Sequence, residues 1–172
     1  MKLGKRLRAA AALLLSAVML LWTGLPVTAA YENTHNNTGK PSQDILAAAE
    51  SQLGYTTPAD GAKYNRWYGA VNGNYTYSWC QTFLSWCAEQ AEIGTDVFPK
   101  AVSVASAYAA FAGQKRYQKS AAQGGSYTPR AGDVAFYSEN GDADALSHVG
   151  LVTGTADGTL YTIEGNVSNQ VQ

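Results

Sequence analysis

Residues 78–91 of the chain read SWCQTFLSWCAEQA, and this stretch decides the fold. Its small and apolar residues recur at the spacing that places side chains on one face of a helix. That face consists of Cys80, Phe83, Leu84, Cys87, Ala88 and Ala91. We therefore predict a helix that begins at Ser78 or a neighbouring residue and ends at Gly94.

The two cysteines of the chain both lie on this predicted helix. Seven residues of helix rise about 10.5 Å, whereas a disulfide requires two Cα atoms within roughly 7 Å of each other. Cys80 and Cys87 are therefore expected to be free thiols.

Two more helices are predicted around it. The first begins at Pro41, which suits a first helical turn, and stops at Gly54, which suits a left-handed end. Its apolar face consists of Ile45, Leu46, Ala49 and Leu53. Another helix is expected over residues 103–112, and the Gly-, Asn- and Tyr-rich residues 55–77 between the first two helices are predicted to form a loop.

The last third of the chain has a β-strand pattern. Residues 133–137, 147–153 and 159–164 are short runs rich in β-forming residues, with Gly-containing turns between them. Residues 156–158, Ala-Asp-Gly, suit a hairpin turn between the last two runs. Helices followed by an antiparallel meander predict an α+β domain with the helices against one face of the sheet.

The composition and the first thirty residues suggest one secreted domain. The chain has 172 residues, of which 46% are apolar and 15% charged, enough for one modest core. Residues 1–30 combine basic residues, an apolar run shorter than the roughly 20 residues that span a bilayer, and small residues before Ala30. We expect a signal peptide cleaved near Ala30, a polar tether over 31–40, and one domain over 41–172 with no stable membrane insertion.

The charge balance narrows the class of partner. Four of the 12 Lys and Arg lie in the first eight residues, so the remaining 8 stand against 13 Asp and Glu. Nucleic acid or an anionic membrane surface would require a basic patch, so neither is expected as the main partner. A neutral polymer or a peptide suits the acidic body better, and we expect it to act as a monomer.

The chemistry can be approached by elimination. The chain has only two histidines, no paired-cysteine or His-Glu-Xaa-Xaa-His metal motif, no phosphate loop after a strand and no Gly-Xaa-Ser-Xaa-Gly elbow. We therefore expect no metal and no cofactor. A cysteine nucleophile with a histidine remains.

Cys80 and His148 are the candidates for that pair. Cys80 falls in the first turn of its predicted helix, where backbone N–H groups favour a thiolate, whereas Cys87 lies two turns deeper and is expected to be a core residue. His35 falls in the tether, so His148 is the histidine of the folded body. Alone it would be a core residue of a half-apolar strand, but it is the base available to Cys80.

The third group of such a site would orient the imidazole. Glu164 and Asn166 follow in the last predicted strand and share a face if side chains alternate there with period two. A hairpin at 156–158 could turn that face toward His148. The alternative is a strand-end turn in which both side chains contact solvent.

Four blocks of the sequence resemble a known family. They are YSWCQTFLSWCA at 77–88, PRAGDVAFY at 129–137, SHVGLVTG at 147–154 and YTIEGN at 161–166. In this order they resemble the CHAP domain, the cysteine- and histidine-dependent amidohydrolase/peptidase module of bacterial cell-wall hydrolases.

The resemblance implies a papain-like α+β fold and a set of roles. Cys80 would be the nucleophile, His148 the general base and Glu164 the residue that orients it, with Asn166 as an auxiliary polar residue. The substrate would be peptidoglycan, cut as an N-acetylmuramoyl-L-alanine amidase or as a stem or cross-bridge endopeptidase. The family normally adds one or two strands after the last block, so a C-terminally incomplete domain or a short sheet is expected.

The groove and the specificity stay open at this point. Aromatic residues before the nucleophile could wall a groove for a glycan or an extended peptide, although some must be core residues; they are Tyr64, Trp67, Tyr68, Tyr75, Tyr77 and Trp79. One alternative is a non-catalytic wall-binding module on the same fold. Another is an enzyme of different specificity, such as an NlpC-type γ-D-glutamyl endopeptidase or a protein deamidase.

Overall fold

The computed structural model describes residues 34–142 and 145–172. The predicted signal peptide and the start of the predicted tether, residues 31–33, lie outside these ranges. No helix in the described part of the chain is long and apolar enough to cross a membrane.

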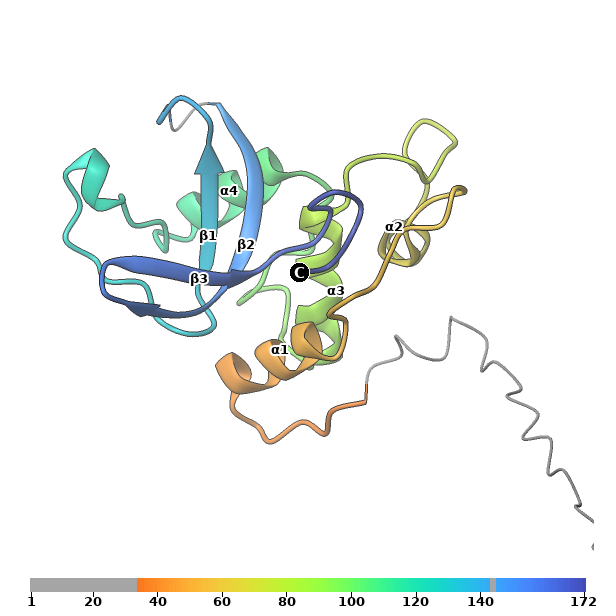
Figure 1. Cartoon of the computed structure of the whole chain (residues 1–172), viewed down its shortest axis with the longest axis horizontal. Helices are drawn as coiled ribbons and strands as arrows, with labels where there is room; N and C mark the ends of the chain where they lie inside the picture. Colours follow the sequence, from red (N-terminus) through yellow and green to blue (C-terminus); the bar gives the residue numbers. More distant parts are fainter. Residues whose placement is uncertain (1–33, 143–144) are drawn as a thin grey trace, which may run out of the picture.

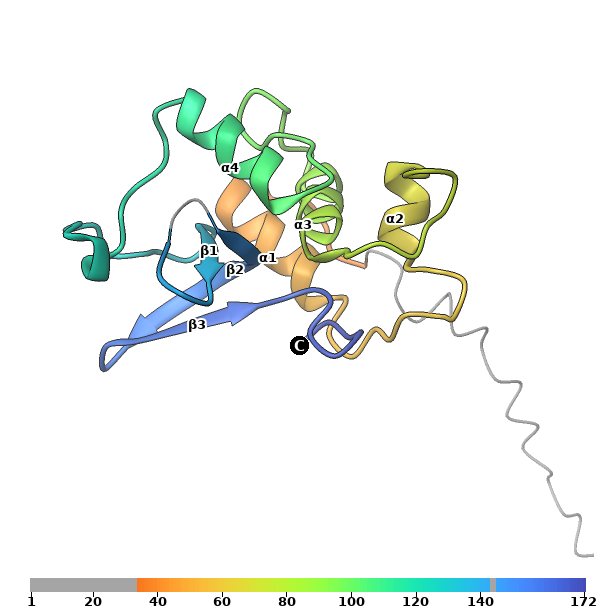
Figure 2. The same cartoon turned by 90° about the horizontal axis from the view of Figure 1, so that it is seen from above.

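The described residues form an α+β fold, as predicted. Four α-helices come first, α1 (Pro41–Glu50), α2 (Lys63–Tyr68), α3 (Cys80–Gln90) and α4 (Val104–Gly113), followed by a 3-10 turn at Ala121–Gln123. Three strands follow, β1 (Val134–Ser138), β2 (Leu146–Ala156) and β3 (Thr159–Ile163). Figures 1 and 2 show α1, α3 and α4 on one side of the sheet, and each of them contacts β2.

Helix α3 lies at the centre of the molecule and matches the predicted stripe. Phe83, Leu84 and Cys87 are fully buried, and the helix packs against α1, α2 and β2. Both cysteines are free, as the spacing predicts. The helix ends at Gln90 rather than Gly94, and its N-cap is Trp79, which provides no side-chain cap.

Helix α1 is shorter than predicted. It ends at Glu50, and Leu53 is 49% exposed instead of lying on the apolar face. The chain turns after the helix because residues 54–57 pair with the C-terminal segment: the Gly54 N–H donates to the Val171 carbonyl at 2.9 Å. Pairing with the C-terminal segment therefore ends the helix before Leu53, although the apolar pattern of the sequence extends to that residue.

Helix α2 interrupts the region predicted to be a loop. It has only six residues and no amphipathic repeat, so periodicity could not reveal it. Its Asn65 side chain is fully buried and donates to the Tyr75 and Tyr77 carbonyls, at 2.9 and 2.8 Å, while it accepts from Thr82 at 2.6 Å. These bonds fasten the segment before Cys80 to helix α3.

The three strands form the predicted antiparallel meander in the order β1-β2-β3. Tyr137 is paired with His148 across β1 and β2, and Val152 with Thr162 across β2 and β3. Asp157 and Gly158 both have positive φ, 51° and 75°, as a two-residue type I′ hairpin turn requires. The predicted hairpin between the last two strands is thus confirmed.

Residues 164–172 fold back along the start of the domain after β3. The Glu164 backbone exchanges two hydrogen bonds with Gln172, at 2.8 and 3.1 Å, and Val171 is 1% exposed. In Figure 1 this segment curls beside α3. The C-terminal residues therefore hold the backbone of Glu164 in place.

Candidate active site

Cys80 is the first residue of α3 and is only 4% exposed. The backbone N–H groups of Gln81 and Val149 act on its sulfur and lower the pKa of the thiol. Val149 directly follows His148 on β2. The fold thus places the start of α3 against the strand that carries the predicted base.

Burial raises the pKa of the Cys80 thiol, and the charge of Glu164 acts in the same direction. The N–H groups of Gln81, Val149 and Cys80 itself lower it but do not compensate. The helix N-terminus alone therefore does not yield the thiolate that the sequence suggests, because desolvation is the larger effect. Ionising this thiol requires a base that takes its proton.

His148 and Glu164 form a side-chain pair in the site. Nε2 of His148 lies 2.9 Å from Oε2 of Glu164, and both side chains are about one-quarter exposed, at 27% and 23%. A carboxylate only accepts hydrogen bonds, so Nε2 carries the proton in the neutral ring. Nδ1 is then the nitrogen that can take a proton from Cys80.

Two glycines make room for this arrangement. A Cβ on Gly150 would lie 2.8 Å from Cγ of Glu164, and a Cβ on Gly165 would lie 2.8 Å from Cβ of Phe83. The first glycine leaves room for the Glu164 side chain to lie over β2 and reach His148. The second lets the chain after β3 approach helix α3.

A hydroxyl chain behind Glu164 was not foreseen from the sequence. The Thr162 hydroxyl donates to Oε1 of Glu164 at 2.7 Å, and the Tyr137 hydroxyl donates to Oγ1 of Thr162 at 3.2 Å. Burial, reinforced by the charge of Glu164, raises the pKa of Tyr137 to about 12, so its hydroxyl remains a donor at neutral pH. The tyrosine ring also stacks on the His148 ring, with centroids 5.9 Å apart.

Period-two alternation could have identified Thr162, because it lies two residues before Glu164. Tyr137 is opposite His148 only in the strand register, which the sequence does not specify. Thr162 thus holds Oε1 of the Glu164 carboxylate, and the Tyr137 ring lies against the imidazole of His148.

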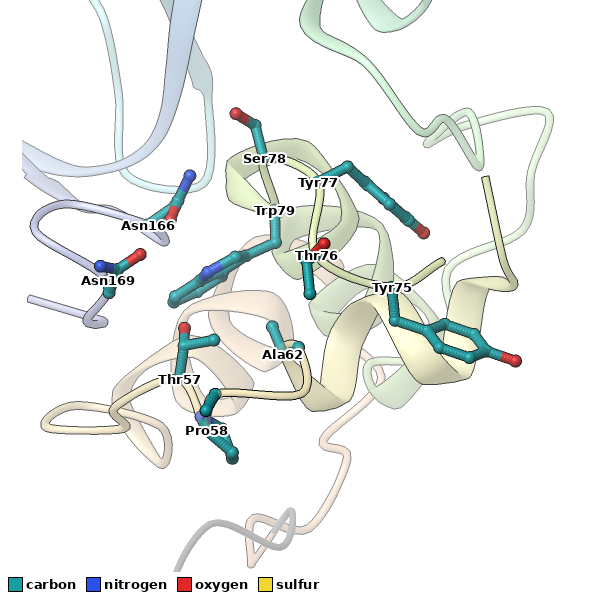
Figure 3. A pocket seen from close by; sticks show the side chains of 12 residues that line it. Thr57, Pro58, Ala62, Tyr75, Thr76, Tyr77, Ser78, Trp79, Asn166 and Asn169 are labelled. Atoms are coloured by element: carbon teal, nitrogen blue, oxygen red, sulfur yellow. The ribbon is translucent and has the colours of Figure 1, made fainter. Parts of the chain in front are cut away.

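Asn166 lies elsewhere than period-two alternation predicts. Strand β3 ends at Ile163, and Asn166 has a φ of 66°, so it does not continue the face of Glu164. Its side chain lines a pocket with Trp79 and Asn169, shown in Figure 3. The hydrogen bonds found in the described ranges include none from its side chain to His148.

The aromatic residues before Cys80 divide between core and pocket. Tyr64 is fully buried, with ring centroids 5.1 to 5.4 Å from those of Tyr55, Trp79, Phe83 and Trp86. Tyr75, Tyr77 and Trp79 line the pocket. Trp67 and Tyr68 lie instead near the Lys100 ammonium, which is 4.0 Å and 5.9 Å from their ring centroids.

The remaining candidates stay outside the site. His35 is 2.7 Å from the Asn37 side chain in the segment before α1, and Cys87 is fully buried in the core, where desolvation raises the pKa of its thiol well above the ordinary value. Within residues 34–142 and 145–172, no group of three or more His, Cys, Asp or Glu could hold a metal ion.

Comparison with known proteins gives one match. The model of the CHAP domain, generally an amidohydrolase or peptidase domain of the peptidoglycan hydrolase type, matches residues 71–166. No curated protein and no solved structure matches the chain. The matched range covers more than half of the chain and contains Cys80, His148, Glu164 and Asn166. The chain therefore belongs to the CHAP-domain family.

Proposed function

We propose that the protein is a secreted peptidoglycan hydrolase that cleaves an amide bond through a Cys80 thioester. The bond is either that between muramic acid and L-alanine or one in the stem or cross-bridge peptide. One observation carries the proposal: Nε2 of His148 lies 2.9 Å from Glu164, and the backbone N–H of the next residue, Val149, lowers the pKa of the Cys80 thiol.

The first half of the reaction forms the thioester. Nδ1 of His148 takes the Cys80 proton, and the thiolate attacks the amide carbonyl carbon. The resulting imidazolium is stabilised by the Glu164 carboxylate on Nε2. It then protonates the departing amine as the carbon–nitrogen bond breaks, which leaves the acyl group on Cys80.

The second half releases the acid. His148, neutral again, takes a proton from a water molecule that attacks the thioester carbonyl, and the thiol leaves with that proton. The backbone N–H of Cys80, at the start of α3, is the proposed donor to the oxyanion in both halves. Asn166 is proposed as an auxiliary that contacts the substrate.

Secretion and a monomeric state complete the proposal. The leader pattern of residues 1–30 directs export, and the acidic body suits a polymer without strong negative charge.

Digestion of purified peptidoglycan tests this function. The protein, its Cys80→Ala variant and, as a matched control, its Cys87→Ala variant are incubated with peptidoglycan, and the soluble products are analysed by mass spectrometry. Release by the protein and by Cys87→Ala, but not by Cys80→Ala, is expected. Intact stem peptides with a free L-alanine amine would identify an amidase, and cleaved stems or bridges an endopeptidase. Equal release by Cys80→Ala would refute the thioester route.

The burial of Cys80 favours one alternative. A thiol that is 4% exposed and has a raised pKa also suits a non-catalytic module that binds the cell wall. Such a module would sediment with peptidoglycan and release nothing from it, and Cys80→Ala would bind as well as the unmodified protein.

A further inference from the structure

A pocket of about 380 Å³ adjoins the proposed catalytic residues, within the size range of ligand sites. It is built from three segments far apart in the sequence: residues 57–62, residues 75–79 and the C-terminal residues Asn166 and Asn169. Trp79 directly precedes Cys80, and Asn166 lies two residues after Glu164. The pocket is therefore lined by residues of the two segments that carry Cys80 and Glu164.

Two polar atoms of the lining lack hydrogen-bond partners although they are buried. They are Nε1 of Trp79, whose side chain is 2% exposed, and Oγ1 of Thr57. Figure 3 shows the Trp79 indole lying among the side chains of Thr57, Asn166 and Asn169. A buried donor without a partner costs about 1–3 kcal/mol. An acceptor atom of a ligand that reaches Nε1 of Trp79 would therefore form a hydrogen bond that this donor otherwise lacks.

The chemistry of the lining is uncharged. Of the described residues, the twelve around this pocket include no Asp, Glu, Lys or Arg. The nearby Asp60 is not among them and forms an ion pair with Arg66. Hydroxyl and amide groups come from Thr57, Thr76, Ser78, Asn166 and Asn169, and exposed apolar surface comes from Pro58 and Ala59.

This combination matches a saccharide better than a stem peptide. Hydroxyls and amides pair with sugar hydroxyls and acetamido groups, while the exposed apolar residues Pro58 and Ala59 suit the acetamido methyl group. Stem peptides carry free carboxylates and an amine, which would lose solvation here without gaining an opposite charge.

We infer that this pocket is a subsite for an uncharged N-acetylated hexosamine unit of the glycan strand. The inference rests on the proposed peptidoglycan hydrolysis and narrows it. Because the lining includes Trp79, next to Cys80 in the sequence, a sugar bound here favours the lactyl–alanine amide of the adjoining muramic acid as the bond that is cut, so we expect an amidase. The acyl group carried by Cys80 is then the muramoyl lactyl group, and the leaving amine is that of L-alanine.

A binding experiment tests the pocket without turnover. The ¹⁵N-labelled Cys80→Ala protein is titrated with N,N′-diacetylchitobiose, and with cellobiose as a disaccharide that lacks acetamido groups. The indole N–H signal of Trp79 is assigned by its loss in a Trp79→Phe variant. The Trp67 indole donates to Glu89 at 2.8 Å outside the pocket and serves as an internal control.

The expected result is a shift of the Trp79 indole signal with diacetylchitobiose, a much smaller shift with cellobiose and none at Trp67. Thr57→Val, which keeps the shape of the side chain but removes its hydroxyl, should weaken binding about five- to tenfold. A shift caused by the stem pentapeptide and not by the disaccharide would overturn the inference. The absence of any shift at a 20-fold molar excess of diacetylchitobiose over the protein would also overturn it.

The inference and the proposed function can fail separately. If peptidoglycan is hydrolysed but the Trp79 indole signal does not shift with the sugar, the proposed function stands and the proposed subsite is wrong. If the sugar binds but nothing is hydrolysed, the subsite stands and the catalytic proposal fails. If both hold, a disaccharide-linked stem should be cleaved with a KM at least tenfold below that of any glycan-free stem.

Discussion

The carboxylate of Glu164 reaches Nε2 of His148, at 2.9 Å, by passing over Gly150 of β2. Glu164 follows the end of β3, and its backbone is held by Gln172. The position of the imidazole therefore depends on Gly150, which has no side chain, and on the C-terminal segment, which holds Glu164 through backbone hydrogen bonds.

A methyl group at position 150 should separate this pair. In Gly150→Ala the new Cβ would lie 2.8 Å from Cγ of Glu164, which must move away. We expect kcat to fall about 10- to 100-fold with little change in KM, because a misplaced base slows the chemical step. Kinetics on solubilised peptidoglycan check this.

Gly154→Ala is the matched control, because it lies on the same strand and its Cβ would meet nothing within 4 Å. Equal losses in both variants would mean that the strand, and not the Glu164 position, is affected.

The Thr162 hydroxyl should act as a positioning group for Glu164. Thr162→Val keeps the shape but removes the 2.7 Å bond to Oε1, and we expect kcat to fall about three- to tenfold. Thr162→Ser should restore most of the activity, which a purely structural role of the methyl group would not predict. Tyr137→Phe should have a smaller effect, and Tyr161→Phe, at a residue 53% exposed, should have none.

The two thiols should differ in their response to pH. Burial raises the pKa of Cys80, so without a base its thiolate forms only above the ordinary thiol range. Because His148 can take its proton, Cys80 should react with iodoacetamide at neutral pH in the protein, and only at higher pH in His148→Ala. Cys87 should remain unmodified until the protein unfolds, because it is fully buried. Mass spectrometry of tryptic peptides measures both rates.

Identical pH profiles of alkylation in the protein and in His148→Ala would show that Cys80 is an isolated buried thiol.

The two thiols should also make the folding stability depend on pH. Folding raises the pKa of both, so the stability that their neutral forms contribute is complete below the ordinary thiol pKa. It is lost as the pH rises through the raised pKa values.

Asn166 should influence binding more than the chemical step. Its side chain lines the pocket, and its φ of 66° favours replacement by glycine, which removes the amide without backbone strain. We expect Asn166→Gly to raise KM about three- to tenfold and to leave kcat within about twofold. A fall in kcat at unchanged KM would instead assign Asn166 to the orientation of His148.

Asn65 should be important for stability. Its buried amide makes three hydrogen bonds, to the Tyr75 and Tyr77 carbonyls and from Thr82. Asn65→Ala should lower the free energy of unfolding by about 2–4 kcal/mol, because it leaves these buried groups unpaired. Denaturant unfolding measures the change, and Asn36→Ala, at an exposed position before α1, should change it by less than about 1 kcal/mol.

The sequence by itself determined the features that depend on local periodicity and residue chemistry. The apolar stripe around Cys80 and Cys87 predicts helix α3, and the Asp157–Gly158 turn predicts the hairpin that brings β3 back along β2. The scarcity of histidine in the chain points to His148. These signals are carried by residues close together in the sequence, so no three-dimensional information is needed to read them.

Tertiary structure decided the features that depend on neighbours far apart in the sequence. The raised pKa of Cys80 results from burial against β2, and the distance between His148 and Glu164 depends on the register over Gly150. Helix α1 ends early because residues 54–57 pair with the C-terminal segment. The pocket joins three separate segments, and only folding brings its unpaired polar atoms together, because desolvation and register are properties of packed surfaces.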